Sequence, residues 1–212
     1  MASKAFSLIL YGETFWGLSE SAKSVDKILL EDIKEYYQKF YAPSLVKATV
    51  VGELTEQEAK QKLELLNRWI PKNVTIPPPP ASQPQQADQV FIYDISGASS
   101  SVIYMGYMAP KFEPYGDFFK NNIANFAFGG NFNSRLNLNL REDKGYTYGI
   151  NSYFGGDKYL GLFMISASVK RKATALSLAE ITKELKNYNE NGITDKEFDY
   201  TCLLYTSDAA DE

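Results

Sequence analysis

The chain has 212 residues, a net charge of −4 and 44% hydrophobic residues, enough apolar surface for one large domain or two small ones. It has no histidine and a single cysteine, Cys202, which excludes Ser-His or Cys-His catalytic units and an internal disulfide. The mixed charges form no basic cluster that would indicate nucleic-acid binding. No apolar run reaches the ~18 residues of a membrane span.

Residues 1–76 predict the order helix, strand, helix. Apolar side chains recur at helical spacing over 31–41, just before a proline. Residues 47–51 are a β-branched run that ends at a glycine, which predicts a strand. A Thr-x-x-Glu capping box at Thr55 then predicts a second helix.

Residues 77–89 are rich in proline and glutamine and have no apolar period. This composition predicts a semi-rigid linker, and a ligand for a proline-reading module is the alternative. The linker is favoured because patterned regions lie on both sides of it. The chain therefore divides into a first α+β domain, 1–76, and a second, 90–201.

The second domain alternates strands and helices without a dinucleotide-binding fingerprint. Strands are expected at 90–95, 101–107, 146–152 and 161–169, and helices at 117–130, 132–143 and 174–190. The last two strands read as an antiparallel hairpin around Gly155-Gly156-Asp157. Together these elements predict an α+β fold, with helices packed on one face of a mostly antiparallel sheet.

A second capping box, at Thr194, predicts a late helix that begins shortly before the end of the chain. The string that follows, 202–212, resembles the conceptual translation of a sequencing-library adapter. We therefore expect these residues, Cys202 included, to be foreign to the natural protein, whose own chain would continue. A frayed C-terminus is the alternative.

The polar residues of 129–149 carry the most distinctive pattern. A spacing of four places three of them on one stripe of the predicted helix: Asn133, Asn137 and Arg141. A neighbouring apolar stripe is expected to be buried: Phe132, Leu136 and Leu140. Aligned donors beside a core stripe suit a peptide-binding edge, while an ordinary solvated face explains the same spacing more simply.

Gly145 ends this predicted helix and two tyrosines follow on a strand. Tyr146 and Tyr148 are two residues apart and should point the same way, with Thr147 opposite. A tyrosine hydroxyl and an arginine close together could donate to a peptide carbonyl, most strongly when that oxygen gains charge during hydrolysis. Packing of the tyrosines on a half-buried sheet is the structural alternative.

The pattern at 134–149, Ser-Arg-Leu-Asn-x-x-Leu-Arg-Glu-x-x-Gly-Tyr-x-Tyr-Gly, follows a Gly-Gly-x-Phe. It resembles the signature of the C-terminal domain of pitrilysin/insulinase-type zinc metallopeptidases. Further matches occur in the expected order: Leu10-Tyr11-Gly12, Leu30-Glu31-Asp32-Ile33, Phe40-Tyr41-x-Pro43, Val50-Val51-Gly52-Glu53 and Ile193-Thr194-x-x-Glu197. The resemblance covers nearly all of 8–200.

This resemblance implies two homologous α+β domains that face each other around a chamber. Zinc would be held by a His-x-x-Glu-His helix upstream of this chain, in the parent protein or a partner subunit, and no metal by the chain itself. An arginine–tyrosine pair would hold the carbonyl of the peptide substrate and falls on Arg141 and Tyr148, with Tyr146 as the alternative tyrosine. Asn133 and Asn137 complete the set of candidate substrate-binding residues.

One motif departs from the family pattern. Thr14-Phe15-Trp16-Gly17 stands where the family commonly has His-Pro-Tyr-Gly. The parent is therefore either a zinc endopeptidase or a non-catalytic subunit that acts as a scaffold or peptide-binding partner. An unrelated α+β binding module is a third interpretation. The bacterial cytoplasm and the periplasm both remain as compartments.

Overall fold

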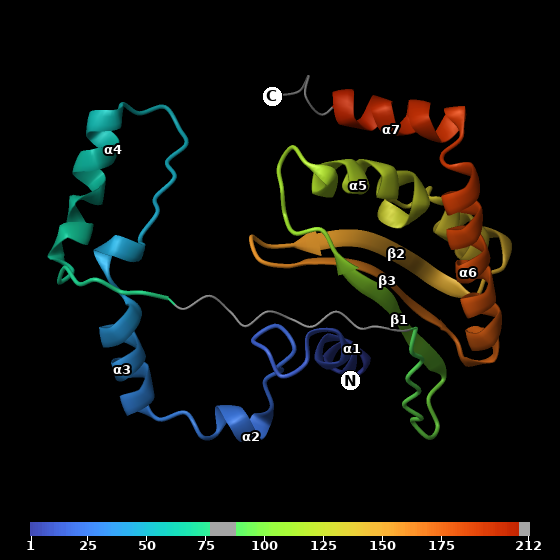
Figure 1. The fold of residues 1–212 in the computed structure, drawn as a ribbon, viewed down its shortest axis with the longest axis horizontal. Coiled ribbons are helices and arrows are strands. Elements are labelled where there is room, and N and C mark those ends of the chain that lie inside the picture. Colours follow the sequence, from blue (N-terminus) through green and yellow to red (C-terminus); the bar gives the residue numbers. More distant parts are fainter. Residues whose placement is uncertain (77–87, 208–212) are drawn as a thin grey trace. The chain divides into compact units, whose positions relative to one another are not determined.

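The computed structural model describes residues 1–76 and 88–207, and it divides the chain into two compact units (Figure 1). The sheet unit comprises Met1–Leu18 together with Ala81–Glu212. The helical unit comprises Ser19–Pro80. Each unit is considered by itself below.

These units differ from the predicted domains at the N-terminus. The predicted first domain, 1–76, is divided, because its first 18 residues belong to the sheet unit. Most of the predicted linker, 77–89, lies outside the described residues, and residues 88 and 89 have no regular structure. Within the predicted foreign tail, 202–212, the last helix continues through Ser207, and 208–212 lie outside the description.

Three antiparallel strands form the sheet, in the order β1-β3-β2. They are β1 (Ser100–Ala109), β2 (Thr147–Gly156) and β3 (Gly161–Lys170). β3 is central and pairs with β1 along its whole length, from Ser100 opposite Lys170 to Ala109 opposite Gly161. The predicted hairpin and the predicted strand at 101–107 are confirmed, and the hairpin turn lies at 157–160.

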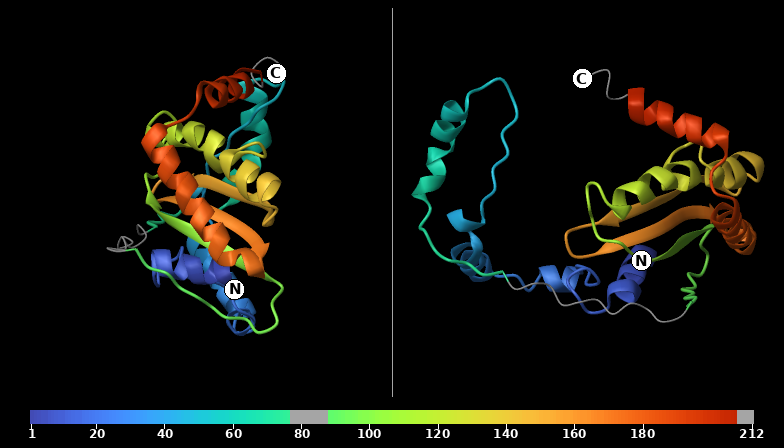
Figure 2. Two further views of the ribbon diagram at one scale, coloured as in Figure 1. Left: turned by 90° about the vertical axis from the view of Figure 1, so that its right-hand side faces the viewer. Right: turned by 45° about the horizontal axis from the view of Figure 1, so that its top comes forward.

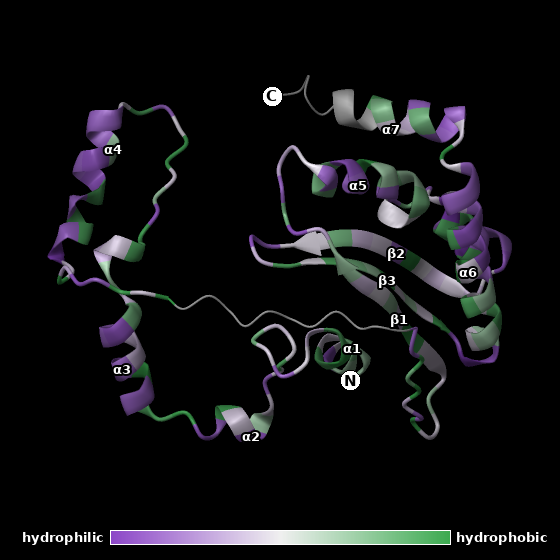
Figure 3. Ribbon diagram, viewed as in Figure 1, coloured by the Kyte–Doolittle hydropathy of each residue, from purple (hydrophilic) through white to green (hydrophobic). Residues whose placement is uncertain are grey.

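Helices cover one face of this sheet, which confirms the predicted α+β fold (Figures 1 and 2). They are α5 (Asp117–Asn125), the π-helical segments η3 (Phe126–Gly130) and η4 (Asn137–Asp143), and α6 (Thr174–Asn191). The 3-10 turn η5 (Arg171–Ala173) leads into α6, and α7 (Asp195–Ser207) packs against η3. A further apolar helix, α1 (Ala2–Tyr11), lies against the opposite face (Figure 3). There the ring of Phe6 lies 5.6 Å from that of Tyr104, whose chain neighbour Ile103 points into the core.

The core lies between the sheet and the covering helices. Its fully buried side chains include Leu136, Leu140, Ile150, Ile165 and Ile181. As predicted, α6 turns Ile181 inward, and Leu178, Leu185 and Tyr188 pack beside it. Phe132, expected in the buried stripe, is 64% exposed, because it precedes the helical segment instead of lying on it.

The helical unit contains short helices and almost no core. Its elements are α2 (Ala22–Val25), α3 (Leu30–Phe40), η1 (Pro43–Leu45), α4 (Glu56–Leu63) and η2 (Glu64–Arg68). The two predicted helices are confirmed, and Thr55 and Glu58 form the predicted capping box of the mainly hydrophilic α4 (Figure 3). Among residues 19–76, Ala42 alone is buried. No described helix is long and apolar enough to cross a membrane.

Two predicted strands are wrong. Residues 47–51 and 90–95 have strand-like sequences but form no ladder with any described segment. An isolated strand leaves its backbone groups unpaired and buries no apolar face, so a β-branched composition cannot hold it in place. Their hydrophobic side chains, among them Val51 and Ile92, are exposed.

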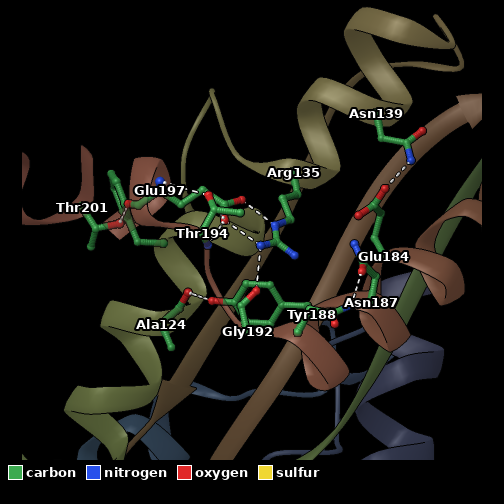
Figure 4. Close-up of polar contacts among 12 residues, drawn as sticks. Ala124, Arg135, Asn139, Glu184, Asn187, Tyr188, Gly192, Thr194, Glu197 and Thr201 are labelled. Carbon is green, nitrogen blue, oxygen red and sulfur yellow. Dashed lines mark hydrogen bonds and ion pairs between the residues drawn. The ribbon is translucent and has the colours of Figure 1, made fainter. Parts of the chain in front are cut away.

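An ion-pair network joins the start of α7 to the helix that carries the polar motif (Figure 4). Arg135 Nη2 donates to Glu197 Oε2 at 2.6 Å and to the carbonyl of Gly192 at 2.7 Å, and its guanidinium lies 4.8 Å from the ring of Tyr188. Thr194 and Glu197 form the predicted capping box. The cap of α7 and the motif helix are therefore held by the same carboxylate.

This network predicts a pH-dependent stability. The hydrogen bond from Arg135 lowers the pKa of Glu197 from 4.5 to about 2, although burial opposes the shift. Since the folded protein binds this proton more weakly than the unfolded chain does, the stabilisation is present above pH 4.5 and is lost as the pH falls toward 2. Both side chains are largely buried, at 13% and 22% exposure, so the contribution is on the order of 2 kcal/mol.

Urea unfolding of the wild type and Glu197→Gln tests this expectation. The wild type should be more stable at pH 7, and the difference should shrink by more than half at pH 2.5. A difference of equal size at both pH values would contradict it.

Candidate functional site

A glycine turn connects the polar motif to the sheet. Gly145 has a φ of +61°, a left-handed conformation that favours glycine, and its N–H donates to the carbonyl of Arg141. The N–H of Tyr146 donates to the carbonyl of Leu140 at 2.8 Å. Arg141 lies just before this turn. Tyr148 lies three residues after it, a span of at most about 10 Å, so the turn brings both to the same end of the sheet.

A buried amide fixes η4 to the outer edge of β2. Asn137 is only 3% exposed; its Oδ1 accepts the N–H of Ile150 at 3.1 Å and its Nδ2 donates to the carbonyl of Ile150 at 2.8 Å. The amide thus completes the hydrogen bonds that a neighbouring strand would make. Two residues further on, Asn125 donates to the carbonyl of Ser152 at 2.8 Å, and its Oδ1 accepts the hydroxyl of Ser152. The edge of β2 is therefore closed to an added peptide strand at these positions.

A bulge turns Tyr148 outward. The register between β2 and β3 shifts between Thr147 and Ile150, both of which are buried, so two residues lie where a regular strand has one. The hydroxyl of Thr147 accepts the N–H of Gly149 and lies 2.7 Å from the carbonyl of Ser168. Between these anchors Tyr148 is 98% exposed. Bulges commonly re-aim a side chain in this way beside functional sites.

Arg141 carries a donor without an acceptor. Its guanidinium lies 3.5 Å from the ring of Phe132, and Nη2 lies 3.3 Å from Glu142 Oε1. Nη1 is buried and has no hydrogen-bond partner among the described residues, while the side chain as a whole is 25% exposed. A buried, unpaired guanidinium nitrogen is costly, and such groups commonly await an acceptor that a ligand or water supplies.

The structure brings only some of the predicted site residues together. Arg141 and Tyr148 flank one turn, and the half-buried Tyr146 is tied down there by its backbone, which accepts the N–H of Lys170. Asn137 faces inward with its amide fully used, so we remove it from the candidate substrate-binding residues. Asn133 precedes the helix and donates to the hydroxyl of Tyr200 in α7.

The predicted polar stripe therefore does not exist as a stripe. An i, i+4 alignment requires a regular α-helix, but residues 137–143 are π-helical, with wider i to i+5 turns. One residue beside Arg141 could not be identified from the helical spacing. Phe132 lies nine positions before Arg141 and was expected in the core, yet its exposed ring covers the guanidinium.

The donor set of this chain does not fit a zinc ion. The sequence has no histidine, and Cys202 is exposed. Among residues 1–76 and 88–207, no three or more Cys, Asp or Glu side chains are grouped to hold a metal. Zinc in proteins is held by at least three such ligands, so zinc chemistry would have to come from another domain or subunit.

The buried amide generates a stability prediction. Asn137→Ala would leave the N–H and the carbonyl of Ile150 buried and unpaired, so we expect a loss of about 2–4 kcal/mol in the free energy of unfolding. Asn133→Ala is the matched control, because this exposed asparagine makes a single side-chain donation, to Tyr200; we expect a change within about 0.5 kcal/mol. Urea unfolding measures both, and equal effects would show that the amide does not anchor η4.

Comparison with known proteins places the chain among peptidase relatives. The model of the family described as the peptidase M16 inactive domain matches residues 27–203. A curated relative, the non-peptidase homolog YmxG of Helicobacter pylori, is 22% identical over 177 residues, which are 84% of this chain and 40% of that protein.

Two solved structures share the fold. A peptidase M16 inactive domain from Pseudomonas fluorescens is 25% identical, with a TM-score of 0.84 over 94% of this chain and 48% of that one. A protease from Helicobacter pylori is 19% identical, with a TM-score of 0.79 over 90% of this chain and 47% of that one. The chain thus spans about half the length of these relatives or less. Because the family model covers most of its residues, the chain belongs to the peptidase M16 family, in the part described as the inactive domain.

Proposed function

We propose that this chain grips the carbonyl group of a peptide through Arg141 and Tyr148 and presents that peptide to a homologous domain that carries zinc. The observation that carries the proposal is the buried Nη1 of Arg141, a charged donor with no acceptor among the described residues. A peptide carbonyl is the uncharged acceptor that would satisfy it. In a hydrolytic transition state the same oxygen becomes negative and would be bound more tightly.

Phe132 would act as a movable cover for this donor. Its ring lies over the guanidinium, yet the ring itself is largely exposed and lies outside the helical segments. Rotation of an exposed side chain costs little, so an arriving peptide could displace the ring and take its place over Arg141. The arginine would then exchange a cation–π contact for a charge-assisted hydrogen bond.

Tyr148 would supply the second donor. Because the bulge holds its backbone between two buried residues, the side chain is exposed on a fixed support. Its hydroxyl is a hydrogen-bond donor that can approach a carbonyl from the side of the sheet, while Arg141 approaches from the helix. Tyr146 is less suited to this task, because it is half-buried at the turn.

A second function is favoured by one comparison. The Helicobacter relative is named a non-peptidase homolog, so this chain could serve a non-catalytic subunit that holds peptide or completes an assembly. The two functions share the gripping residues and differ in their consequence for catalysis. In the first, Arg141 and Tyr148 stabilise a transition state; in the second, they bind substrate and transition state alike.

Peptide binding by the isolated chain tests the shared part of the proposal. A fluorescently labelled unstructured peptide should bind the wild type, and Arg141→Ala or Tyr148→Phe should weaken binding by about fivefold or more, which corresponds to the loss of one hydrogen bond of about 1 kcal/mol. Arg68→Ala and Tyr115→Phe are matched controls, because both side chains are exposed and neither belongs to the candidate site. Equal affinities in all five proteins would contradict the gripping role.

Kinetics with the zinc-bearing half present separate the two functions. In a peptidase that contains this chain, Arg141→Ala or Tyr148→Phe should lower kcat/KM roughly 10²-fold if the pair stabilises the oxyanion. A rise in KM at constant kcat would assign the pair to substrate binding alone. The chain by itself should neither cut peptides nor retain zinc through dialysis.

A further inference from the structure

The motif in which this chain departs from its family, Thr14-Phe15-Trp16-Gly17, packs against the far end of the β2–β3 hairpin. Trp16 Nε1 donates to Asp157 Oδ2 at 3.0 Å. The indole ring lies 6.4 Å from the ring of Tyr11 at the end of α1 and 6.3 Å from that of Tyr159 in the hairpin turn. The segment after α1 is thus tied to the turn by one hydrogen bond and by ring contacts.

A cavity of about 320 Å³ opens at this contact. Tyr11, Trp16 and Tyr153 supply its aromatic walls. Gly155, Gly156 and Gly161 are also among the lining residues, so part of the floor is bare backbone. Tyr153 follows the core-facing Ser152, which places the cavity on the face of the sheet opposite α5 and α6. The carbonyl-gripping turn lies at the other end of β2.

Asp157 gives the cavity a negative charge. Partial burial of this carboxyl would raise its pKa, but backbone N–H groups of Leu160 and Tyr159 and the indole of Trp16 donate to it, and the pKa of Asp157 is lowered. Burial raises the pKa values of Tyr11 and Tyr153, which therefore stay neutral. The side chain of Lys158, whose Nζ lies 4.6 Å from the ring of Tyr159, is not among the lining residues.

We propose that this cavity binds the basic side chain of an arginine or lysine in an extended peptide. Aromatic faces attract cations through their quadrupole, and the effect is strongest where water is partly excluded. A carboxylate at the rim selects a positive charge over an apolar side chain of the same size. The ammonium of Lys158 already makes such a contact with one ring of this cluster. The proposal does not depend on the role of Arg141 and Tyr148.

Fluorescence of Trp16 provides the test. The chain has two tryptophans, and Trp69→Phe leaves Trp16 as the sole reporter. The probes are N-acetyl-arginine amide, N-acetyl-lysine amide, the uncharged N-acetyl-norleucine amide and the acidic N-acetyl-glutamate amide. We expect a saturable change with the two basic probes and none with the others. An equal response to norleucine amide would show that the cavity binds apolar side chains without regard to charge, and it would overturn the proposal.

Two variants test the two halves of the site. Asp157→Asn keeps an oxygen that can accept the turn N–H groups but removes the charge and the acceptor of the Trp16 indole N–H, and it should weaken binding of the basic probes about three- to fivefold. Tyr11→Leu removes a wall and should weaken binding by a similar factor. Tyr115→Leu, at an exposed tyrosine that is not among the lining residues, should leave binding unchanged.

Circular dichroism of each variant confirms that the fold is intact. If Asp157→Asn does not fold, Tyr11→Leu and the comparison of charged with uncharged probes still decide the question. Wild-type affinity in both folded variants would overturn the proposal. Arg141→Ala should bind the basic probes normally, so that failure here and failure of carbonyl gripping are distinguishable.

Discussion

The side-chain amide of Asn137 is the constraint on which the candidate site depends. By pairing with both backbone groups of Ile150, it holds a π-helical segment against the edge of β2 where a fourth strand could otherwise lie. The helix that carries Arg141 and the strand that carries Tyr148 are then fixed to each other by hydrogen bonds inside the core. A shift of either element would leave two buried backbone groups unpaired, so the relative position of the two backbone segments is fixed.

The irregular elements of the sheet unit gather around this anchor. Two π-helical segments, 126–130 and 137–143, precede the turn at Gly145, and the bulge of β2 follows that turn at once. π-Helical turns and bulges both cost backbone regularity and are frequent at functional sites. Within the described residues, Nη1 of Arg141 has no hydrogen-bond partner beside these elements, and Tyr148 is exposed on the bulge.

Sequence reasoning succeeded where local patterns decide the structure. Capping boxes at Thr55 and Thr194, the glycine that ends the motif helix and the inward face of α6 are all set by neighbours within a few residues. Sequence reasoning failed where the structure of a segment depends on a partner that is distant in the sequence. The strand-like residues of 47–51 and 90–95 lack such a partner, and the contact of Phe132 with Arg141 arises from a loop that no periodicity describes.

Because the chain has no histidine, its candidate functional residues are hydrogen-bond donors, and these are the residues that the sequence pattern could identify. A group that only binds a carbonyl oxygen needs a permanent donor, and a guanidinium remains charged throughout the neutral range, so neither histidine nor a metal is required in this domain. Proton transfer and water activation would need titratable groups or zinc, and would fall to a facing domain. On the proposed function, this division of labour would explain why an arginine and a tyrosine seven positions apart stand out in the sequence.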